Sequence, residues 1–469
     1  MPARAASQGP RGSGARVQAG AALMLRPGAG IMLGMPDIIE PRVLKGFRDY
    51  LPEAEIERRG LVEKLELAFR SFGFVPIDTP CLEYAEILLG KGGGETDKQV
   101  YRFPDKGGRD VALRFDLTVP FARFMAEHVD ELYLPFRRYH MAKVWRGENT
   151  QRGRYREFMQ CDFDIVGADS AAADADIVLC IAEAMRALEV GEVRIRINHR
   201  GLFNRFLASI GAAEKSTAVL RAVDKLDKIG AEAVREQLAA DLGGEAAGKV
   251  LDFIRQEEGF EATLAKLESL AGGPGPDTAR LRAIWAQARE AGAADGLVLD
   301  PSITRGLDYY TGVVFETSLS ALPEIGSVCS GGRYDELASL YTTRRLPGVG
   351  ASVGLDRLLA ALEALGRSRP RPGYAQVLVL DVEEELEPRY QGIARALRAA
   401  GIACEVYPEK RKLGAQFAYA EKKGMAFALV VGGEEAAAGR IQVKDLKTRE
   451  SVEAASLEAA LELLRGRLA

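Results

Sequence analysis

A short run rich in proline and arginine divides this chain of 469 residues into two unequal parts. The run reads RSRPRPG at residues 367–373 and has the composition of an exposed linker. A chain of this length exceeds what one ordinary core holds, so two or three domains are expected. We therefore predict a linker at residues 366–373, a larger domain over residues 37–365 and a smaller one over residues 374–469.

The smaller domain alternates between strand-like and helical patterns. This order implies a compact α/β sheet flanked by helices. Basic side chains at residues 410–412 and 422–423 fit solvated surface charge and nucleic-acid contact about equally well. The strand-like runs lie at residues 377–382, 402–407, 427–431 and 440–443, and the helical segments at residues 388–399 and 413–423.

The larger domain has the pattern of an α+β fold built on an antiparallel sheet. Residues 53–72 have the apolar spacing of an amphipathic helix. A short proline-bounded strand follows at residues 74–80 and is unsuited to the centre of a sheet. Three strand-like runs at residues 111–115, 142–145 and 158–166 are joined by polar turns, which indicates antiparallel pairing.

The second half of the larger domain changes character. Alanine, leucine and charged residues dominate residues 212–298 with helical spacing, so we predict a mostly helical insertion there. Strand character returns at residues 313–316. Small residues at 348–365 then lead into a helix that carries Arg357.

Composition narrows the function classes. A net charge of −4 and a pI near 5.8 argue against binding nucleic acid, such as DNA, by bulk electrostatics, so any nucleic-acid contact needs local basic surfaces. Five scattered cysteines without a Cys-x-x-Cys pair, and three histidines without metalloprotease spacing, predict a reduced cytoplasmic protein with no metal-binding motif. No apolar run reaches the length of a membrane span.

Residues 1–36 are rich in alanine, glycine, arginine and proline and contain no acid. We expect a disordered extension or an over-extended start, since Met24, Met32 and Met35 stand just before the first patterned segment. A transit peptide is the less favoured alternative.

Side chains suited to binding an anion and a purine follow one another near the middle of the larger domain. Arg146 follows a strand-like run, and the next run alternates two arginines, an aromatic ring, an amide and an acid. Arginine has a planar fork of donors that grips phosphate or carboxylate. The alternating residues are predicted to project from one face of an antiparallel pair: Arg154, Arg156, Phe158, Gln160 and Asp164.

Two later tracts concentrate charge and phenol groups. The sequence RGLDYY at residues 305–310 holds one cation, one carboxylate and two phenols, and GGRYD at residues 331–335 adds Tyr334. This composition suits a pocket for a small, polar, charged substrate.

Together these stretches resemble the histidyl-tRNA synthetases, over about residues 37–469. The resemblance implies a class II antiparallel-sheet catalytic domain with a helical insertion and a C-terminal α/β anticodon-binding domain. It implies activation of L-histidine with ATP, Mg²⁺ bound with the ATP, transfer to tRNA(His), and a homodimer. The sequence QCDFD at residues 160–164 is similar to the eukaryotic-type branch of the family.

The resemblance also assigns roles to residues. Arg146 and Arg305 are the catalytic candidates, because they would flank the α-phosphate where negative charge accumulates. Neutral imidazole has one donor and one acceptor nitrogen, and Asp164 with Tyr310 would match that pair. The predicted ATP-binding residues are Arg146, Glu148, Arg154, Phe158 and Arg357. The predicted histidine-binding residues are Asp116, Thr118, Arg146, Gln160, Asp164, Arg305, Tyr309, Tyr310 and Tyr334.

Two alternatives stay open. The first is a non-catalytic, histidine-sensing regulatory subunit of ATP phosphoribosyltransferase, a paralogue that lacks the anticodon domain; residues 374–469 argue against it. The second is another class II synthetase, such as the prolyl or threonyl enzyme; the tracts at residues 305–310 and 331–335 argue against that one.

Overall fold

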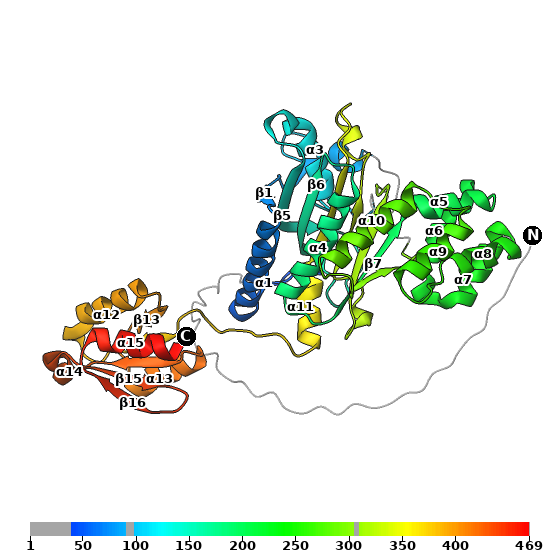
Figure 1. Ribbon diagram of the computed structural model, residues 1–469. Helices are drawn as coiled ribbons and strands as arrows, with labels where there is room; N and C mark the ends of the chain where they lie inside the picture. Colours follow the sequence, from blue (N-terminus) through cyan, green and yellow to red (C-terminus); the bar gives the residue numbers. More distant parts are fainter. Residues whose placement is uncertain (1–38, 91–97, 304–308, 469) are drawn as a thin grey trace, which may run out of the picture. The chain divides into compact units, whose positions relative to one another are not determined.

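The computed structural model describes residues 39–90, 98–303 and 309–468. These residues form sheets of eight, five and three strands with helices around them (Figure 1). The predicted extension at residues 1–36 lies outside the described residues, and so does Arg305. None of the helices within the described ranges combines the length and the apolar composition that a membrane span requires.

The largest sheet runs in the order β1-β5-β6-β11-β10-β9-β7-β8. Its strands are antiparallel except at the two edges, where β1 pairs with β5 and β7 pairs with β8 in parallel. The predicted antiparallel pairing is therefore confirmed for the runs at residues 142–145 and 158–166, and the strand with Pro76 lies at an edge. The prediction was wrong for residues 111–115, because the strand there belongs to a separate small sheet. The strands span Val75–Pro76 (β1), Phe136–Trp145 (β5), Glu157–Val166 (β6), Val193–His199 (β7), Leu297–Leu299 (β8), Val313–Leu319 (β9), Cys329–Arg333 (β10) and Gly348–Gly354 (β11).

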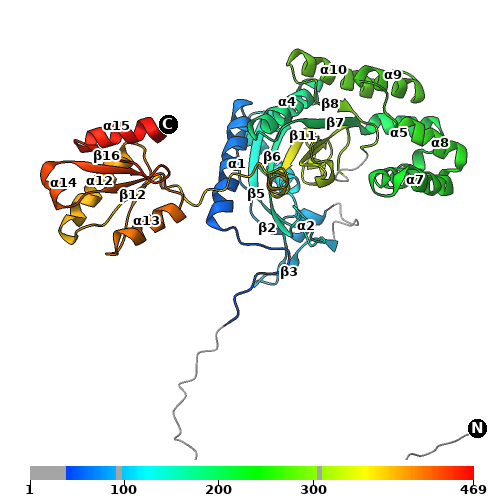
Figure 2. The same ribbon diagram turned by 90° about the horizontal axis from the view of Figure 1, so that it is seen from below.

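Three helices cover one face of this sheet and form its core. Cys161, Phe163 and Ile165 of β6 are buried in that core, and the Phe163 ring lies 4.6 Å from the ring of Phe69 on α1. Helix α1 begins with a proline and two acids in its first turn, a sequence that favours a helix start. Figure 2 shows α1 and α4 alongside the sheet. The helices span Pro52–Ser71 (α1), Ala171–Ala187 (α4) and Leu355–Ala364 (α11).

A small three-stranded sheet stands beside helix α3 (Thr118–His128). Its order is β2-β4-β3, with antiparallel pairing throughout. The turn between β4 and α3 holds Asp116, which has no exposed surface. The elements span Leu82–Tyr84 (β2), Ala85–Leu89 (α2), Arg102–Pro104 (β3) and Asp110–Leu113 (β4).

Six helices follow β7 and match the helical pattern of the insertion. Stacked rings hold them together, with Phe206 and Phe253 at a centroid distance of 4.1 Å. The helices span Arg200–Ser209 (α5), Ser216–Val223 (α6), Leu226–Leu242 (α7), Gly244–Phe253 (α8), Phe260–Leu270 (α9) and Pro276–Glu290 (α10).

The structure corrects the interpretation of residues 348–365, whose first half is strand β11 rather than a lead into the helix. Strand β10 was also not predicted. Both strands are rich in glycine, which has low strand propensity. The reason for glycine is steric: a Cβ atom on Gly331 would lie 2.1 Å from the carbonyl oxygen of Gly350.

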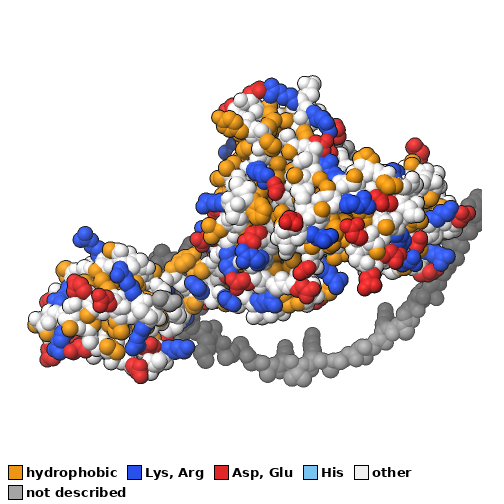
Figure 3. Space-filling model, viewed as in Figure 1, with side chains coloured by type: hydrophobic (Ala, Val, Ile, Leu, Met, Phe, Trp, Pro, Cys, Tyr) orange, Lys and Arg blue, Asp and Glu red, His pale blue; other side chains and the backbone are white. Residues whose placement is uncertain are grey.

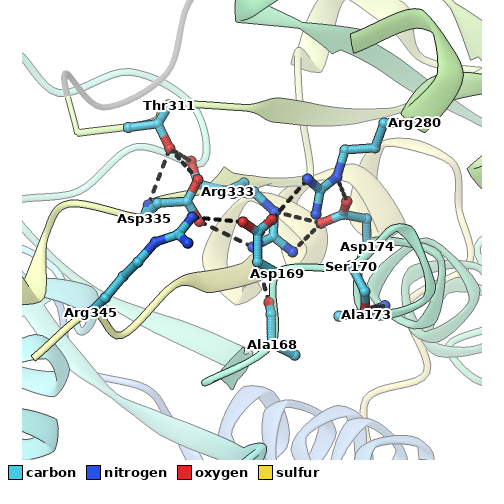
Figure 4. Close-up of polar contacts among 10 residues, drawn as sticks. All are labelled: Ala168, Asp169, Ser170, Ala173, Asp174, Arg280, Thr311, Arg333, Asp335 and Arg345. Atoms are coloured by element: carbon cyan, nitrogen blue, oxygen red, sulfur yellow. Dashed lines mark hydrogen bonds and ion pairs between the residues drawn. The ribbon is translucent and has the colours of Figure 1, made fainter. Parts of the chain in front are cut away.

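A cluster of arginines and aspartates ties the end of β10 to α4 and α10 (Figure 4). Arg333 donates to Asp174 from two nitrogens, at 2.9 and 2.6 Å, and Arg280 of α10 donates to the other oxygen of Asp174 at 2.5 Å. The Arg333 side chain is 1% exposed and that of Asp174 is 0% exposed. Asp169 and Asp335 complete the cluster through ion pairs to Arg280 and Arg333.

Residues 377–454 contain the five-stranded sheet, in the order β13-β12-β14-β15-β16. Strand β12 pairs in parallel with β13 and β14, and the other two pairs are antiparallel. The predicted alternation of strands and helices is confirmed; strand β16 and helices α14 and α15 were not predicted. The elements span Val377–Val379 (β12), Glu387–Ala399 (α12), Cys404–Val406 (β13), Leu413–Lys422 (α13), Phe427–Val430 (β14), Gly433–Ala438 (α14), Ile441–Asp445 (β15), Ser451–Ala454 (β16) and Leu457–Leu468 (α15).

Candidate functional site

A pocket of about 280 Å³ opens on the face of the large sheet opposite its helices. Strand β6 contributes every second residue to it, as strand geometry requires. A smaller hollow of about 120 Å³ adjoins it and shares four of its arginine and glutamine side chains. Of the predicted residues, the larger pocket is lined by Thr118, Arg146, Arg154, Gln160, Asp164, Tyr309, Tyr310, Tyr334 and Arg357. The smaller hollow adds Glu148 and Phe158.

Asp116 does not line the pocket itself, but it contacts Tyr309, whose side chain does. One carboxylate oxygen accepts from the backbone N–H of Val119 at 3.0 Å, and the other accepts from the Tyr309 hydroxyl at 3.2 Å. Burial raises the pKa of Asp116. Asp116 therefore orders the start of α3 and fixes the Tyr309 ring.

Two more carboxylates enter the pocket wall from β6. Asp164 accepts from the Tyr334 hydroxyl at 2.5 Å and lies 2.8 Å from Arg138, while Asp162 lies 4.0 Å from the same guanidinium. Arg138 is fully buried and stacks over Phe121 at 4.1 Å. Burial raises the pKa of both carboxyls, that of Asp162 to about 7.

A glycine on the neighbouring strand makes room for this arrangement. A Cβ atom on Gly350 would lie 2.0 Å from a carboxylate oxygen of Asp164. Gly350 is the register partner of Asp164, so the carboxylate lies flat against β11. This end of the pocket gathers buried carboxylates and favours a cationic group on the ligand.

Replacing Asp162 with asparagine should stabilise the protein more at pH 8 than at pH 5. A carboxyl whose folded-state pKa is raised contributes stability at low pH that is lost as the pH rises through about 7. Besides burial, the charges of Asp164 and Asp116 raise this pKa, whereas Arg138 and a hydrogen bond from Ser352 lower it. The variant's free energy of unfolding relative to wild type should rise by about 2–3 kcal/mol over that range, measured by urea unfolding. A difference that stays flat with pH would contradict this.

The other end of the site gathers arginines. Arg146 donates from Nε to the carbonyl oxygen of Phe115 at 2.9 Å, and its guanidinium lies 5.1 Å from the Phe158 ring centre. Arg154 lies 3.6 Å from Glu148. Burial, with the neighbouring charge of Arg154, lowers the pKa of Arg357 to about 10. Three guanidiniums at one end of a cleft suit an anionic group such as a phosphate chain.

The predicted common face of the second strand is partly wrong. Strand β6 begins only at Glu157, and the preceding residues form a tight turn with a bridge between Gln151 and Arg154. Arg156 therefore turns away from the pocket, packs against Gly46 and donates to the carbonyl oxygen of Glu148 at 3.3 Å. The alternation holds from Phe158 onward, where the strand is regular.

Sequence reasoning missed three side chains in or beside the pocket. Asp162 has the same parity as Gln160 and Asp164, so the alternation itself could have found it. Arg138 and Ser352 come from β5 and β11, and no sequence signal links them to β6. Arg305 lies outside the described residues.

Two models of known protein families match this chain. The family model for histidyl-tRNA synthetase matches residues 46–358, and the anticodon binding domain model matches residues 376–467. The chain belongs to the histidyl-tRNA synthetase family. A histidine--tRNA ligase of Treponema denticola is 53% identical over 440 residues, which cover 91% of this chain and 98% of the relative.

Other relatives agree. The histidine--tRNA ligase of Rhodopirellula baltica is 51% identical over 89% of this chain and 96% of its own. The crystal structure of histidyl-tRNA synthetase from Nostoc sp. PCC 7120 superposes with a TM-score of 0.84 at 35% identity, covering 92% of this chain and all of that one. These relatives are bacterial, so they do not support the similarity to a eukaryotic-type branch. The matches confirm the class II α+β fold with its C-terminal domain.

The regulatory-subunit alternative has a weaker counterpart. A structure described as an ATP phosphoribosyltransferase regulatory subunit/histidyl-tRNA synthetase from Bacillus halodurans shares the fold, with a TM-score of 0.68 at 24% identity. That likeness concerns the fold alone. The relatives with 51–53% identity support the interpretation as a synthetase.

Proposed function

We propose that this chain is a histidine--tRNA ligase. It activates L-histidine with ATP to histidyl-adenylate, then transfers the histidyl group to the 3′ end of tRNA(His) and releases AMP and diphosphate. The observation that carries the proposal is the distribution of charged side chains along strand β6. Buried carboxylates line one end of the site, and arginines line the other end. That arrangement suits an amino acid whose carboxylate meets a nucleotide phosphate.

Histidine binds at the carboxylate end in this proposal. Thr118 and Gln160 line the pocket and contact the α-ammonium group, and Asp116 acts on that group from behind the wall, through the Tyr309 hydroxyl that it holds. Asp164 and Tyr310 match the two imidazole nitrogens, and burial raises the pKa of Tyr310, which keeps its hydroxyl neutral. Tyr309 and Tyr334 help to order the pocket through their bonds to Asp116 and Asp164. Arg305 is proposed to bind the histidine carboxylate.

ATP binds at the arginine end. Phe158 offers a ring face to the adenine, Arg154 and Arg357 hold the phosphates, and Glu148 orients Arg154. Among these arginines Arg146 bonds the carbonyl oxygen of Phe115, the neighbour of Asp116, and so connects the arginine end with the carboxylate end. It is thereby suited to contact the α-phosphate and the histidine carboxylate together.

Activation is an in-line displacement at the α-phosphorus. A histidine carboxylate oxygen attacks, the bond from the α-phosphorus to the bridging oxygen breaks, and diphosphate leaves with the electron pair. Negative charge builds on the α-phosphate oxygens in the transition state, and Arg146 and Arg305 stabilise it. In the second step a terminal hydroxyl of the tRNA attacks the carbonyl carbon, and AMP leaves.

Mg²⁺ fits this site as an ion held mainly by the nucleotide. Within the described residues, no group of three or more histidine, cysteine, aspartate or glutamate side chains is arranged to hold a metal ion. The carboxylates that line this end of the site include Glu148, Glu316 and Asp356, and each pairs with an arginine. Magnesium bound to ATP typically takes one or two carboxylates plus phosphate oxygens, and supplies charge neutralisation to the leaving diphosphate.

The tRNA partner, a homodimer and a cytoplasmic location complete the proposal. Residues 374–469 would bind the anticodon, with residues 37–365 as the catalytic domain and residues 366–373 as the linker. Figure 3 shows basic and acidic side chains interspersed over the visible face, in keeping with the small net charge. RNA contact by such a surface depends on local groups such as Lys410 and Lys412.

Histidine-dependent exchange of pyrophosphate into ATP, measured without tRNA and against a panel of amino acids, tests the proposal. We expect exchange with histidine and not with the other amino acids, followed by charging of tRNA(His) when the tRNA is added. Histidine binding by calorimetry without any exchange would instead support the regulatory-subunit alternative.

A further inference from the structure

The Gln160 side chain has one satisfied end and one unsatisfied end. Its amide nitrogen donates to the Ser352 hydroxyl at 2.9 Å and to the Asp162 carboxylate at 3.5 Å. Its carbonyl oxygen is buried and has no hydrogen-bond partner among the described residues. Gln160 is 8% exposed and lines the pocket. A buried acceptor without a donor is costly unless a ligand supplies the donor.

The direction of these hydrogen bonds follows from the amide nitrogen, which can only donate, at one end of the chain and the Asp162 carboxyl at the other. The Ser352 hydroxyl donates to Asp162, a bond that lowers the pKa of Asp162. The Ser352 oxygen is then left to accept, and it accepts from the amide nitrogen of Gln160. A flipped amide would place a carbonyl oxygen against two acceptors.

We propose that Asp162 and Ser352 are positioning residues that hold the Gln160 amide in one orientation, with its carbonyl oxygen directed at the α-ammonium group of the bound amino acid. This inference rests on the proposed function, because it names histidine as the ligand. It adds two residues that act through Gln160 and touch no reacting atom.

The strands provide the rigidity that such a chain of hydrogen bonds needs. Asp162 and Ser352 are register partners on β6 and β11, and Gln160 lies two residues along the same face. Behind them, Arg138 from β5 balances the charge of Asp162 and Asp164. The orientation of the amide is therefore set before the ligand arrives.

Ser352→Ala is the decisive variant, because it breaks the chain of hydrogen bonds and leaves the Asp162 carboxyl in place. We expect the KM for histidine in pyrophosphate exchange to rise ~3- to 10-fold in Ser352→Ala and about 10-fold or more in Asp162→Asn, with little change in the KM for ATP. Ser318→Ala, a serine of strand β9 that does not line the pocket, is the matched control and should leave both constants unchanged.

Two further measurements separate positioning from a general structural effect. Calorimetry with wild type and Ser352→Ala should show weaker binding of histidine and of histidinol, and unchanged binding of imidazole propanoate, which lacks the ammonium group. In a Gln160→Leu background, Ser352→Ala should have no further effect on histidine affinity.

Each outcome decides the matter. An unchanged histidine KM in Ser352→Ala, or equal loss of all three ligands, overturns the positioning role while wild-type exchange still upholds the proposed function. Histidine binding without exchange leaves the ligand affinities as the test of the positioning role and overturns the ligase proposal. Absence of histidine binding in the wild type overturns both.

Discussion

Replacing Arg146 with alanine should lower the rate of histidyl-adenylate formation ~100- to 1000-fold and leave the fold intact. The guanidinium is held before the reaction by its bond to the carbonyl oxygen of Phe115 and by stacking near Phe158, so it needs no reorganisation as charge develops. Preorganised donors of this kind lose about that factor when they are removed. The effect should fall on kcat in pyrophosphate exchange, with a smaller change in the KM for ATP.

Arg152→Ala is the matched control for this prediction. Arg152 is an exposed arginine in the same connection between β5 and β6 and lines neither hollow. The Arg152→Ala variant should therefore exchange pyrophosphate at the wild-type rate. Arg305→Ala should lose as much as Arg146→Ala, since both are proposed to flank the α-phosphate. A loss in Arg146→Ala confined to the KM for histidine would contradict the transition-state role.

Replacing Arg333 with methionine should destabilise the protein by about 3 kcal/mol. The change leaves Asp174, which has no exposed surface, without two of its three hydrogen bonds within the cluster of Figure 4. Removing one partner of a buried ion pair costs about 3–5 kcal/mol, and the remaining bond from Arg280 places the effect at the lower end. Urea unfolding of the apo protein followed by circular dichroism measures the loss.

Arg345→Met serves as the comparison in the same cluster. Arg345 pairs with Asp169 at 2.8 Å, but its side chain is 70% exposed, so solvent screens the pair. Its loss should cost less than about 1 kcal/mol. Equal destabilisation by the two variants would mean that burial does not govern the strength of this cluster.

Tyr334 follows Arg333 directly and bonds Asp164, so Arg333→Met should also weaken histidine binding.

The sequence predicted elements well where residue patterns are local. Amphipathic spacing located α1, and alternation located β6 from Phe158 onward. It failed at β10 and β11, where glycines are demanded by the close approach of two backbones, a contact between residues far apart in the chain. It failed also for Arg156, because a parity argument assumes a strand and the chain there is still in a turn.

The side chains proposed to contact ligands could be predicted from the sequence, but the side chains that hold them in position could not. The side chains that would touch ligands stand in dense motifs, so spacing and residue type reveal them. Arg138 and Ser352 support those side chains from separate strands, and only the register of β5, β6 and β11 brings them together. Such register depends on the whole sheet and cannot be read from a segment.

Strand β6 also bears on how this site can change during evolution. Its odd-numbered residues, such as Phe163, fill the core, and its even-numbered residues, such as Asp162, face the proposed ligand pocket. Point substitutions on the ligand face can therefore accumulate without repacking the interior. A single-residue insertion or deletion within the strand would exchange the two faces at once, so drift in substrate preference here must proceed by substitution alone.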